Sequence, residues 1–180
     1  MNHSKVCNYG CFSDMNADQA ERKPRVHVLT LICSLMIPIL VGCFSTLLTM
    51  DDMNVYGTLV RPPLAPPGWL FPIIWGVMYV LMGLAAYFAL TGFSGPLRKW
   101  IAMSFYYTQL MMNFFWPILF FTYSRYTLSL SWLIVMWWMT FVCMFKFYRI
   151  RKIAGVFMGI ILAWTTYAIY LNFAYVLYTR

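Results

Sequence analysis

Charged residues are missing from long stretches of the chain and cluster between them. No Asp, Glu, Lys or Arg occurs in residues 26–50, 62–97, 100–124, 126–145 or 153–179. Each stretch can hold the ~20 apolar residues that an α-helix needs to cross a lipid bilayer. We therefore predict five transmembrane helices, at residues 27–49, 69–91, 100–121, 127–147 and 154–178.

The fold class follows from the lack of alternation within these stretches. A membrane β-barrel shows ~10-residue segments in which apolar and polar residues alternate. Here apolar residues occupy consecutive positions, and a helix satisfies its backbone hydrogen bonds within one segment. The sequence predicts an all-α, integral membrane five-helix bundle, with a polar tail at residues 1–25 and a single domain at residues 26–180. Short connections predict that the second to fifth helices are antiparallel neighbours in chain order.

Composition and charge agree with a membrane protein. Hydrophobic residues make up 62% of the chain and charged residues only 10%, whereas a soluble domain carries about 25% charged residues. Ten of the 13 Lys and Arg residues precede the first helix or lie between helices two and three or four and five. The positive-inside rule therefore predicts a cytoplasmic N-terminus. The net charge of +8 indicates a lipid bilayer as partner, and no nucleic acid.

The residue types that bind metals give no metal-site prediction. His3, Cys7 and Cys11 in the tail match no common zinc spacing and lack a fourth ligand. A cleaved lipoprotein leader ending before Cys43 is an alternative for the first helix, although cleavage would remove that helix from the bundle.

The connection at residues 51–68 is long and rich in proline. It contains four prolines, while connections in helical bundles usually run about 2–8 residues. Proline fixes φ and removes a backbone donor, so this segment is stiff and not helical throughout. Long structured loops are often lids. We predict a lid that includes Pro66, Pro67 and Trp69, with a rigid spacer as the alternative.

Few polar side chains fall within the predicted spans. Gln109 and Asn113 share one face of the third helix, and Asn172 lies on the fifth. Such amides either tie helices together by hydrogen bonds or line a ligand cavity, and the residues alone leave both open. The spans contain no acid and no basic residue, so conventional acid–base catalysis and ion-coupled transport are not indicated.

Aromatic residues make up 20% of the chain. Aromatic walls suit flat, apolar ligands, and a deep tryptophan often lies at a pocket or a helix contact. Simple packing is the alternative for any one of them. The deep tryptophans are Trp75, Trp116, Trp137, Trp138 and Trp164.

Three motifs carry a family resemblance. Residues 61–79 read RPPLAPPGWLFPIIWGVMY and are followed by Met82-Gly83; residues 109–117 read QLMMNFFWP and are followed by Phe120-Phe121. The third motif is Trp164 followed by Ala168, Leu171 and Asn172. Together they resemble the translocator protein family, also called the tryptophan-rich sensory protein or TspO/MBR family. The segment APPGWLF at residues 65–71 is closer to bacterial relatives. It suggests a bacterial inner membrane.

The resemblance implies a cavity capped by loop 51–68. Members of this family bind porphyrins, and some bind sterols or aromatic drug-like ligands. No cofactor is required, and porphyrin is the expected ligand. Carried over position by position, the ligand site would comprise Trp75, Tyr79, Asn113, Trp116, Trp164, Ala168 and Leu171.

The resemblance leaves three functions open. The first is a tetrapyrrole-binding sensor, carrier or regulator. The second is a light-dependent enzyme that degrades protoporphyrin, with Trp75 and Trp164 as the catalytic candidates, because an indole stacked on an excited porphyrin could donate an electron. The third is a structural membrane subunit without a ligand pocket.

Two departures from the family pattern affect the remaining expectations. Phe173 stands where the sterol pattern of vertebrate members has tyrosine, which puts sterol binding in doubt. Ser104 and Thr108 replace a Gly-xxx-Gly pair on the third helix. Both are small enough for close packing, so a homodimer through this helix is a prediction.

Overall fold

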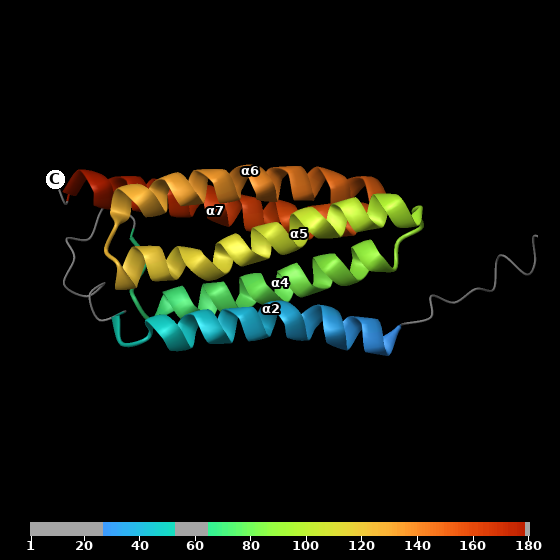
Figure 1. The fold of residues 1–180 in the computed structure, drawn as a ribbon, viewed down its shortest axis with the longest axis horizontal. Coiled ribbons are helices and arrows are strands. Elements are labelled where there is room, and N and C mark those ends of the chain that lie inside the picture. The colour runs from blue at the N-terminus through green and yellow to red at the C-terminus, as the bar shows by residue number, and fades with distance from the viewer. Residues whose placement is uncertain (1–26, 53–64, 179–180) are drawn as a thin grey trace, which may run out of the picture.

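The computed structural model describes residues 27–52 and 65–178. Five long helices lie side by side along one axis (Figure 1). The described ranges contain no strand, so the all-α prediction is confirmed. The helices are α2 (Val28–Thr49), α4 (Leu70–Leu90), α5 (Pro96–Pro117), α6 (Tyr126–Ile150) and α7 (Lys152–Tyr178), and a π-helix, η2 (Ile118–Thr122), continues α5.

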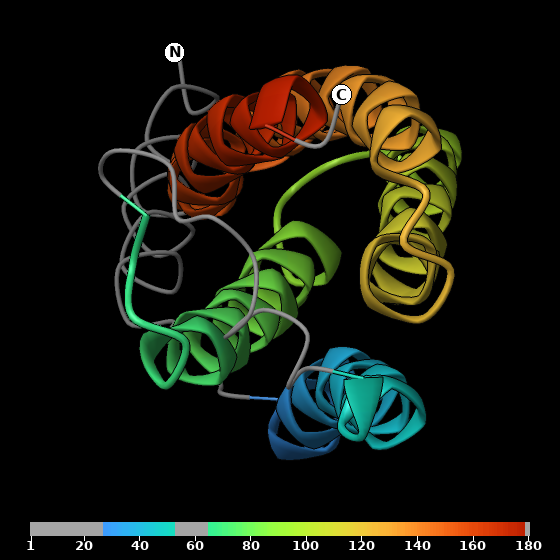
Figure 2. The same ribbon diagram turned by 90° about the vertical axis from the view of Figure 1, so that its left-hand side faces the viewer.

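The helices form a ring when the bundle is viewed along its axis. Figure 2 shows the order α7, α6, α5, α2, α4, with α4 returning to α7. The prediction of neighbours in chain order holds from α5 to α7 but is wrong for α4, which packs mainly against α2 and α7. The reason is that the connection at residues 91–95 crosses the end of the bundle instead of making a tight hairpin.

Four of the helices, α2, α4, α6 and α7, are long and apolar enough to cross a membrane. Helix α5 is equally long but less apolar, because it carries Tyr106, Gln109 and Asn113. All three side chains are buried in the bundle, whereas Met111 and Phe115 of the same helix are exposed. Helix α5 therefore turns these three polar side chains inward, whereas Ser104 and Thr108 stay on its outer face and donate to carbonyls of their own helix.

The predicted helix ends agree with the structure to within about four residues. Helix α5 begins at Pro96, earlier than expected, because proline is favourable at the first helical position. Helix α6 continues past Lys146 and Arg149 to Ile150. Basic side chains near a helix C-terminus interact favourably with the helix dipole, so these charges did not mark the end of the helix.

One end of the bundle, here the basic end, holds the α4–α5 connection and the α6–α7 junction (right in Figure 1). Packing is tight in this half. A Cβ atom at Gly83 would lie 2.8 Å from the Leu35 Cα, and one at Gly155 would lie 2.5 Å from the Tyr148 Cβ. The Lys99 ammonium donates to the Leu90 carbonyl at 2.6 Å, which caps the C-terminus of α4.

Candidate functional site

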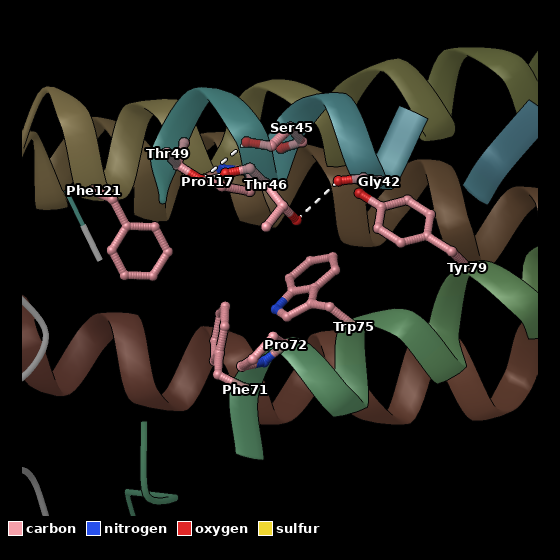
Figure 3. A pocket seen from close by; sticks show the side chains of 10 residues that line it. All are labelled: Gly42, Ser45, Thr46, Thr49, Phe71, Pro72, Trp75, Tyr79, Pro117 and Phe121. Carbon is pink, nitrogen blue, oxygen red and sulfur yellow. Dashed lines mark hydrogen bonds between the residues drawn. The ribbon is translucent and has the colours of Figure 1, made fainter. Parts of the chain in front are cut away.

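Two small cavities lie at the opposite end of the bundle, here the pocket end. The first, the α2 lobe, lies between α2, α4 and the α5–η2 junction (Figure 3). Its lining residues are Gly42, Ser45, Thr46, Thr49, Phe71, Pro72, Trp75, Tyr79, Pro117 and Phe121. The second, the α7 lobe, is lined by Phe71, Trp116, Phe120, Trp164, Ala168, Leu171, Asn172 and Tyr175.

Side chains occupy most of the space in both lobes. The free volume is about 30 Å³ in the α2 lobe and about 20 Å³ in the α7 lobe, room for roughly one or two water molecules each. Sites for drug-sized ligands usually measure about 300–1,000 Å³. A ligand of that size can enter only if lining side chains move.

Three aromatic rings separate the lobes, and we call them the aromatic partition: Phe71, Trp75 and Trp116. The two indoles are stacked, with ring centroids 5.5 Å apart and planes at 21°. The Phe71 ring lies 5.8 Å from Trp75 and 6.2 Å from Trp116, and it lines both lobes. The Phe71 ring is thus common to both lobes, and each of the two stacked indoles lines one of them.

Local backbone geometry places the rings of the η2 segment. Pro117 has no N–H, the Ile118 N–H bonds to Phe115, and the Tyr123 N–H reaches back five residues to the Ile118 carbonyl. Such wide turns interrupt α-helices, frequently at functional sites. As a result the consecutive residues Phe120 and Phe121 are both buried, one in each lobe.

Helix α2 forms a wall of small residues opposite Trp75 and Phe71 (Figure 3). A Cβ atom at Gly42 would lie 2.4 Å from the Tyr79 ring, so this close approach requires glycine. The Ser45 hydroxyl donates to the Phe114 carbonyl of α5 at 3.1 Å. Because Ile118 bonds to Phe115 instead of Phe114, Ser45 supplies a donor to a carbonyl at the irregular turn.

Three of the tryptophans that line the lobes have unpaired indole donors. Among the described residues, the buried indole nitrogens of Trp75, Trp116 and Trp164 have no hydrogen-bond partner. By contrast, Trp132 donates to the Met112 carbonyl at 3.0 Å and Trp137 donates to the Thr166 hydroxyl at 2.8 Å. An unpaired buried donor costs about 1–3 kcal/mol, so the lobes carry hydrogen-bonding capacity that the fold leaves unused.

The structure brings together six of the seven predicted ligand-binding residues. Trp75 and Tyr79 line the α2 lobe, while Trp116, Trp164, Ala168 and Leu171 line the α7 lobe. Asn113 lines neither lobe. Its amide donates to the backbone carbonyl of Gln109 in the same helix at 3.0 Å. The role of Asn113 in ligand binding stays a prediction.

The three predicted lid residues line neither lobe. Trp69 is the residue immediately before α4 and is 68% exposed, and Pro66 and Pro67 precede it. Residues 53–64 of the loop lie outside the described residues, as do the tail with His3, Cys7 and Cys11. The lid therefore stays a prediction.

Asn172 ties two helices together. Its amide donates to the Ser129 hydroxyl of α6 at 2.9 Å, and the residue also lines the α7 lobe, so both alternatives that the sequence left open apply to it. Elsewhere, the predicted dimer residues Ser104 and Thr108 lie on the outer surface, where their hydroxyls donate to carbonyls of their own helix. Dimer formation stays a prediction.

Several lining residues were not among the predicted site. Phe71, Phe120 and Phe121 were present in the quoted motifs but were not assigned a role. Their signal was periodicity, since Phe71 and Trp75 are four residues apart and share a helix face. The α2 wall gave no signal beyond a run of small residues, because Gly42, Ser45 and Thr49 could equally face a neighbouring helix.

Comparison with known proteins gives the family. Residues 34–177 match the TspO/MBR family. The chain belongs to this family. It is 30% identical over 148 residues to the tryptophan-rich protein TspO of Chlorobaculum tepidum, covering 81% of this chain and 93% of that one. It is 36% identical to the tryptophan-rich sensory protein of Cereibacter sphaeroides (66% and 72% covered) and 29% identical to the translocator protein of Bos taurus (68% and 73%).

Membership of the TspO/MBR family and the four apolar helices together identify an integral, multi-pass membrane protein. The match begins within α2 and ends within α7, so it includes both lobes and the aromatic partition.

Proposed function

We propose that this chain binds porphyrins, or similar flat apolar aromatic ligands, in a site made by joining the two lobes, and that it acts as a sensor, carrier or regulator. The stacked Trp75–Trp116 pair carries the proposal, because both rings are buried in the pocket end and neither indole nitrogen has a partner among the described residues. Stacked indoles offer a large flat apolar surface to another aromatic ring.

Movement of the aromatic partition is central to this proposal. Either lobe alone is too small for a macrocycle, but the two share the Phe71 ring. Rotation of Phe71 would join the lobes without a change in the helices, because its ring lines both. A flat ligand would then replace the aromatic contacts of Phe71 with its own.

The test is a titration of the purified protein with protoporphyrin in the dark, followed by tryptophan fluorescence. We expect saturable quenching with one ligand per chain. Trp75→Phe and Trp116→Phe should each weaken binding by about tenfold, the equivalent of ~1.4 kcal/mol in lost contacts. Trp138→Phe is the matched control, since Trp138 on α6 is 55% exposed and lines neither lobe. Absence of saturable quenching would refute the proposal.

The same titration decides the position of Asn113. Asn113→Leu should weaken binding without unfolding the bundle if the amide turns toward the ligand. Unchanged affinity would remove Asn113 from the site and leave it as a structural residue paired with Gln109.

Light-dependent degradation of protoporphyrin is the second candidate. The observation in its favour is that both catalytic candidates, Trp75 and Trp164, have buried indole nitrogens and line the two lobes, one each. Illumination of the complex separates the two functions. Porphyrin that stays intact in light indicates binding alone, whereas loss of its absorbance that is abolished by Trp75→Phe or Trp164→Phe indicates the enzyme.

We propose further that the basic end faces the cytoplasm of a bacterial inner membrane. The first turns of α5 and α7 and the α6–α7 junction carry Arg98, Lys99, Arg151 and Lys152 at this end, in agreement with the positive-inside rule. In cells, a cysteine introduced at Phe93, an exposed position in the α4–α5 connection, should resist a membrane-impermeant thiol reagent until the membrane is opened. Labelling of this position in intact cells would show that the basic end faces outward, which is the opposite orientation.

A further inference from the structure

We propose that the basic end binds the headgroup of an anionic phospholipid, at the surface where the start of α5 meets the α6–α7 junction. This site lies at the opposite end of the bundle from the two lobes and is independent of porphyrin binding. It follows from three features of the basic end: cations gathered from two segments, a lack of counter-charges, and exposed apolar side chains beside the cations.

The α4–α5 connection and the α6–α7 junction pack directly against each other. A Cβ atom at Gly92 would lie 2.7 Å from the Ile150 side chain and 3.3 Å from the Ile150 carbonyl oxygen. Helix α5 begins shortly after Gly92, at Pro96, and α7 begins shortly after Ile150, at Lys152. This contact therefore brings the basic residues of both segments to one surface (right in Figure 1).

The cations of this surface have no acidic partner. Among the described residues the only acids are Asp51 and Asp52, at the pocket end. The tail at residues 1–25 carries four basic and three acidic residues, so its own charges cannot neutralise the surface. The six cations at the basic end are Arg98, Lys99, Lys146, Arg149, Arg151 and Lys152.

Neutral groups of the protein hold three of the six cations. Lys99 donates to a carbonyl at the end of α4 at 2.6 Å. The Lys146 ammonium lies 4.8 Å from the centre of an aromatic ring on α5, and the Arg151 guanidinium lies 4.9 Å from the centre of one on α4. These contacts fix the side chains in position. They leave the positive charges unbalanced, because none of the partners carries a negative charge.

The other three cations, Arg98, Arg149 and Lys152, are exposed. Within residues 27–52 and 65–178, their side chains have no hydrogen-bond or ring partner. A phosphate group that reached this surface would thus meet three free cations, with the three fixed ones close behind. Basic residues between transmembrane helices at a membrane surface are a setting in which anionic lipid headgroups bind.

Apolar neighbours favour a lipid over a soluble anion. Trp100 and Tyr148 are exposed on α5 and α6 near the cations, and Trp and Tyr are enriched at the level of the lipid headgroups. Phe93 and Leu97, on either side of the start of α5, are also exposed. A phospholipid can place its phosphate on the cations and its acyl chains along these apolar side chains, whereas free phosphate uses only the charges.

The test is native mass spectrometry of the full chain in detergent, with phosphatidylglycerol or phosphatidylcholine of the same acyl chains added. We expect one phosphatidylglycerol to be retained per chain, with an apparent affinity about tenfold higher than that of phosphatidylcholine, a difference of ~1.4 kcal/mol. The ratio of the two affinities should fall as the salt concentration rises, because salt screens exposed charges.

Variants connect this preference to the three free cations. The triple variant Arg98→Gln, Arg149→Gln, Lys152→Gln should bind the two lipids equally, and each single change should reduce the ratio about threefold. The ratio is measured within one variant and is therefore independent of its yield. Arg125→Gln is the matched control, because Arg125 is an exposed cation at the pocket end, and it should keep the wild-type ratio.

Three results would overturn the inference. Equal retention of the two lipids by the wild-type chain would show that the surface does not select for negative charge. A preference that persists in the triple variant would place the lipid elsewhere on the protein. Displacement of phosphatidylglycerol by millimolar glycerol phosphate would show that the surface takes a water-soluble phosphate instead of a lipid. None of these results bears on the porphyrin titration at the pocket end.

Discussion

The two ends of this bundle are built from the same helices but differ in how their side chains pack. At the basic end, glycines allow backbones to approach closely, and Lys99 satisfies a helix C-terminus. At the pocket end, aromatic side chains meet across two small cavities, and indole donors remain unpaired. Both ends contain close glycine contacts and unpaired buried groups, but the two cavities and the three unpaired indoles described above lie at the pocket end.

The difference separates stability from binding within a single chain. Tight packing gives a rigid frame, because each side chain has one well-filled position. Unpaired donors and small cavities cost stability, yet they are the groups that a ligand can use. Substitutions at close backbone contacts or paired amides should therefore alter stability first, and substitutions of the unpaired indoles should alter binding first.

The largest expected effect is at the tight contact between α2 and α4. Gly83→Ala should lower the free energy of unfolding by about 2–3 kcal/mol, since the added Cβ would lie 2.8 Å from backbone atoms of α2. Thermal unfolding in detergent measures this loss. Gly76→Ala on the same helix is the control, because nothing lies within 4 Å of its Cβ position. Equal stability of the two variants would contradict tight packing at Gly83.

Asn172→Leu should have the next largest effect. It removes the amide that donates to Ser129 across α6 and α7, and the expected loss is about 1–2 kcal/mol. If chemical unfolding detects no change in Asn172→Leu, the interhelical hydrogen bond contributes nothing to stability.

Gln109→Leu should act in the opposite direction. Within the described residues, both amide atoms of Gln109 are buried without a partner, so an apolar side chain of similar size should stabilise the ligand-free protein by about 1 kcal/mol. Thermal unfolding of Gln109→Leu beside Asn172→Leu compares an unpaired amide with a paired one. Destabilisation of both would show that Gln109 has a partner in solution.

The smallest effect on stability is expected from Trp75→Phe. The indole nitrogen has no partner to lose, and most of the apolar ring surface is kept, so the change should stay under about 1 kcal/mol. Porphyrin affinity should nevertheless fall about tenfold. A large loss of stability with unchanged affinity would reverse the proposed division between close contacts and unpaired indoles.

The sequence predicted most of the fold. Charge-free windows located all five helices, because a charge is costly inside a bilayer and loops collect charged residues. Helix ends were less certain, since Lys146 and Arg149 continue α6 instead of ending it. The position of α4 between α2 and α7 was missed, because connection length alone does not determine which way a chain crosses the end of a bundle.

Six of the seven residues predicted for the ligand site line the two lobes, whereas the Asn113 amide bonds to its own helix. Their role in ligand binding stays a prediction. The aromatic partition could not be foreseen, because the stacking of Trp75 on Trp116 depends on the spacing and rotation of two separate helices. The lack of partners for the indole nitrogens could not be predicted either, because hydrogen-bond partners depend on how the helices pack.

The shared wall at Phe71 makes the two lobes interdependent. A molecule that pushes this ring out of one lobe changes the room left in the other. By thermodynamic reciprocity, whatever occupies the first lobe changes affinity in the second by the same factor in both directions. A small ligand in the α2 lobe would therefore act on a ligand in the α7 lobe as an allosteric effector, over a distance of one phenyl ring.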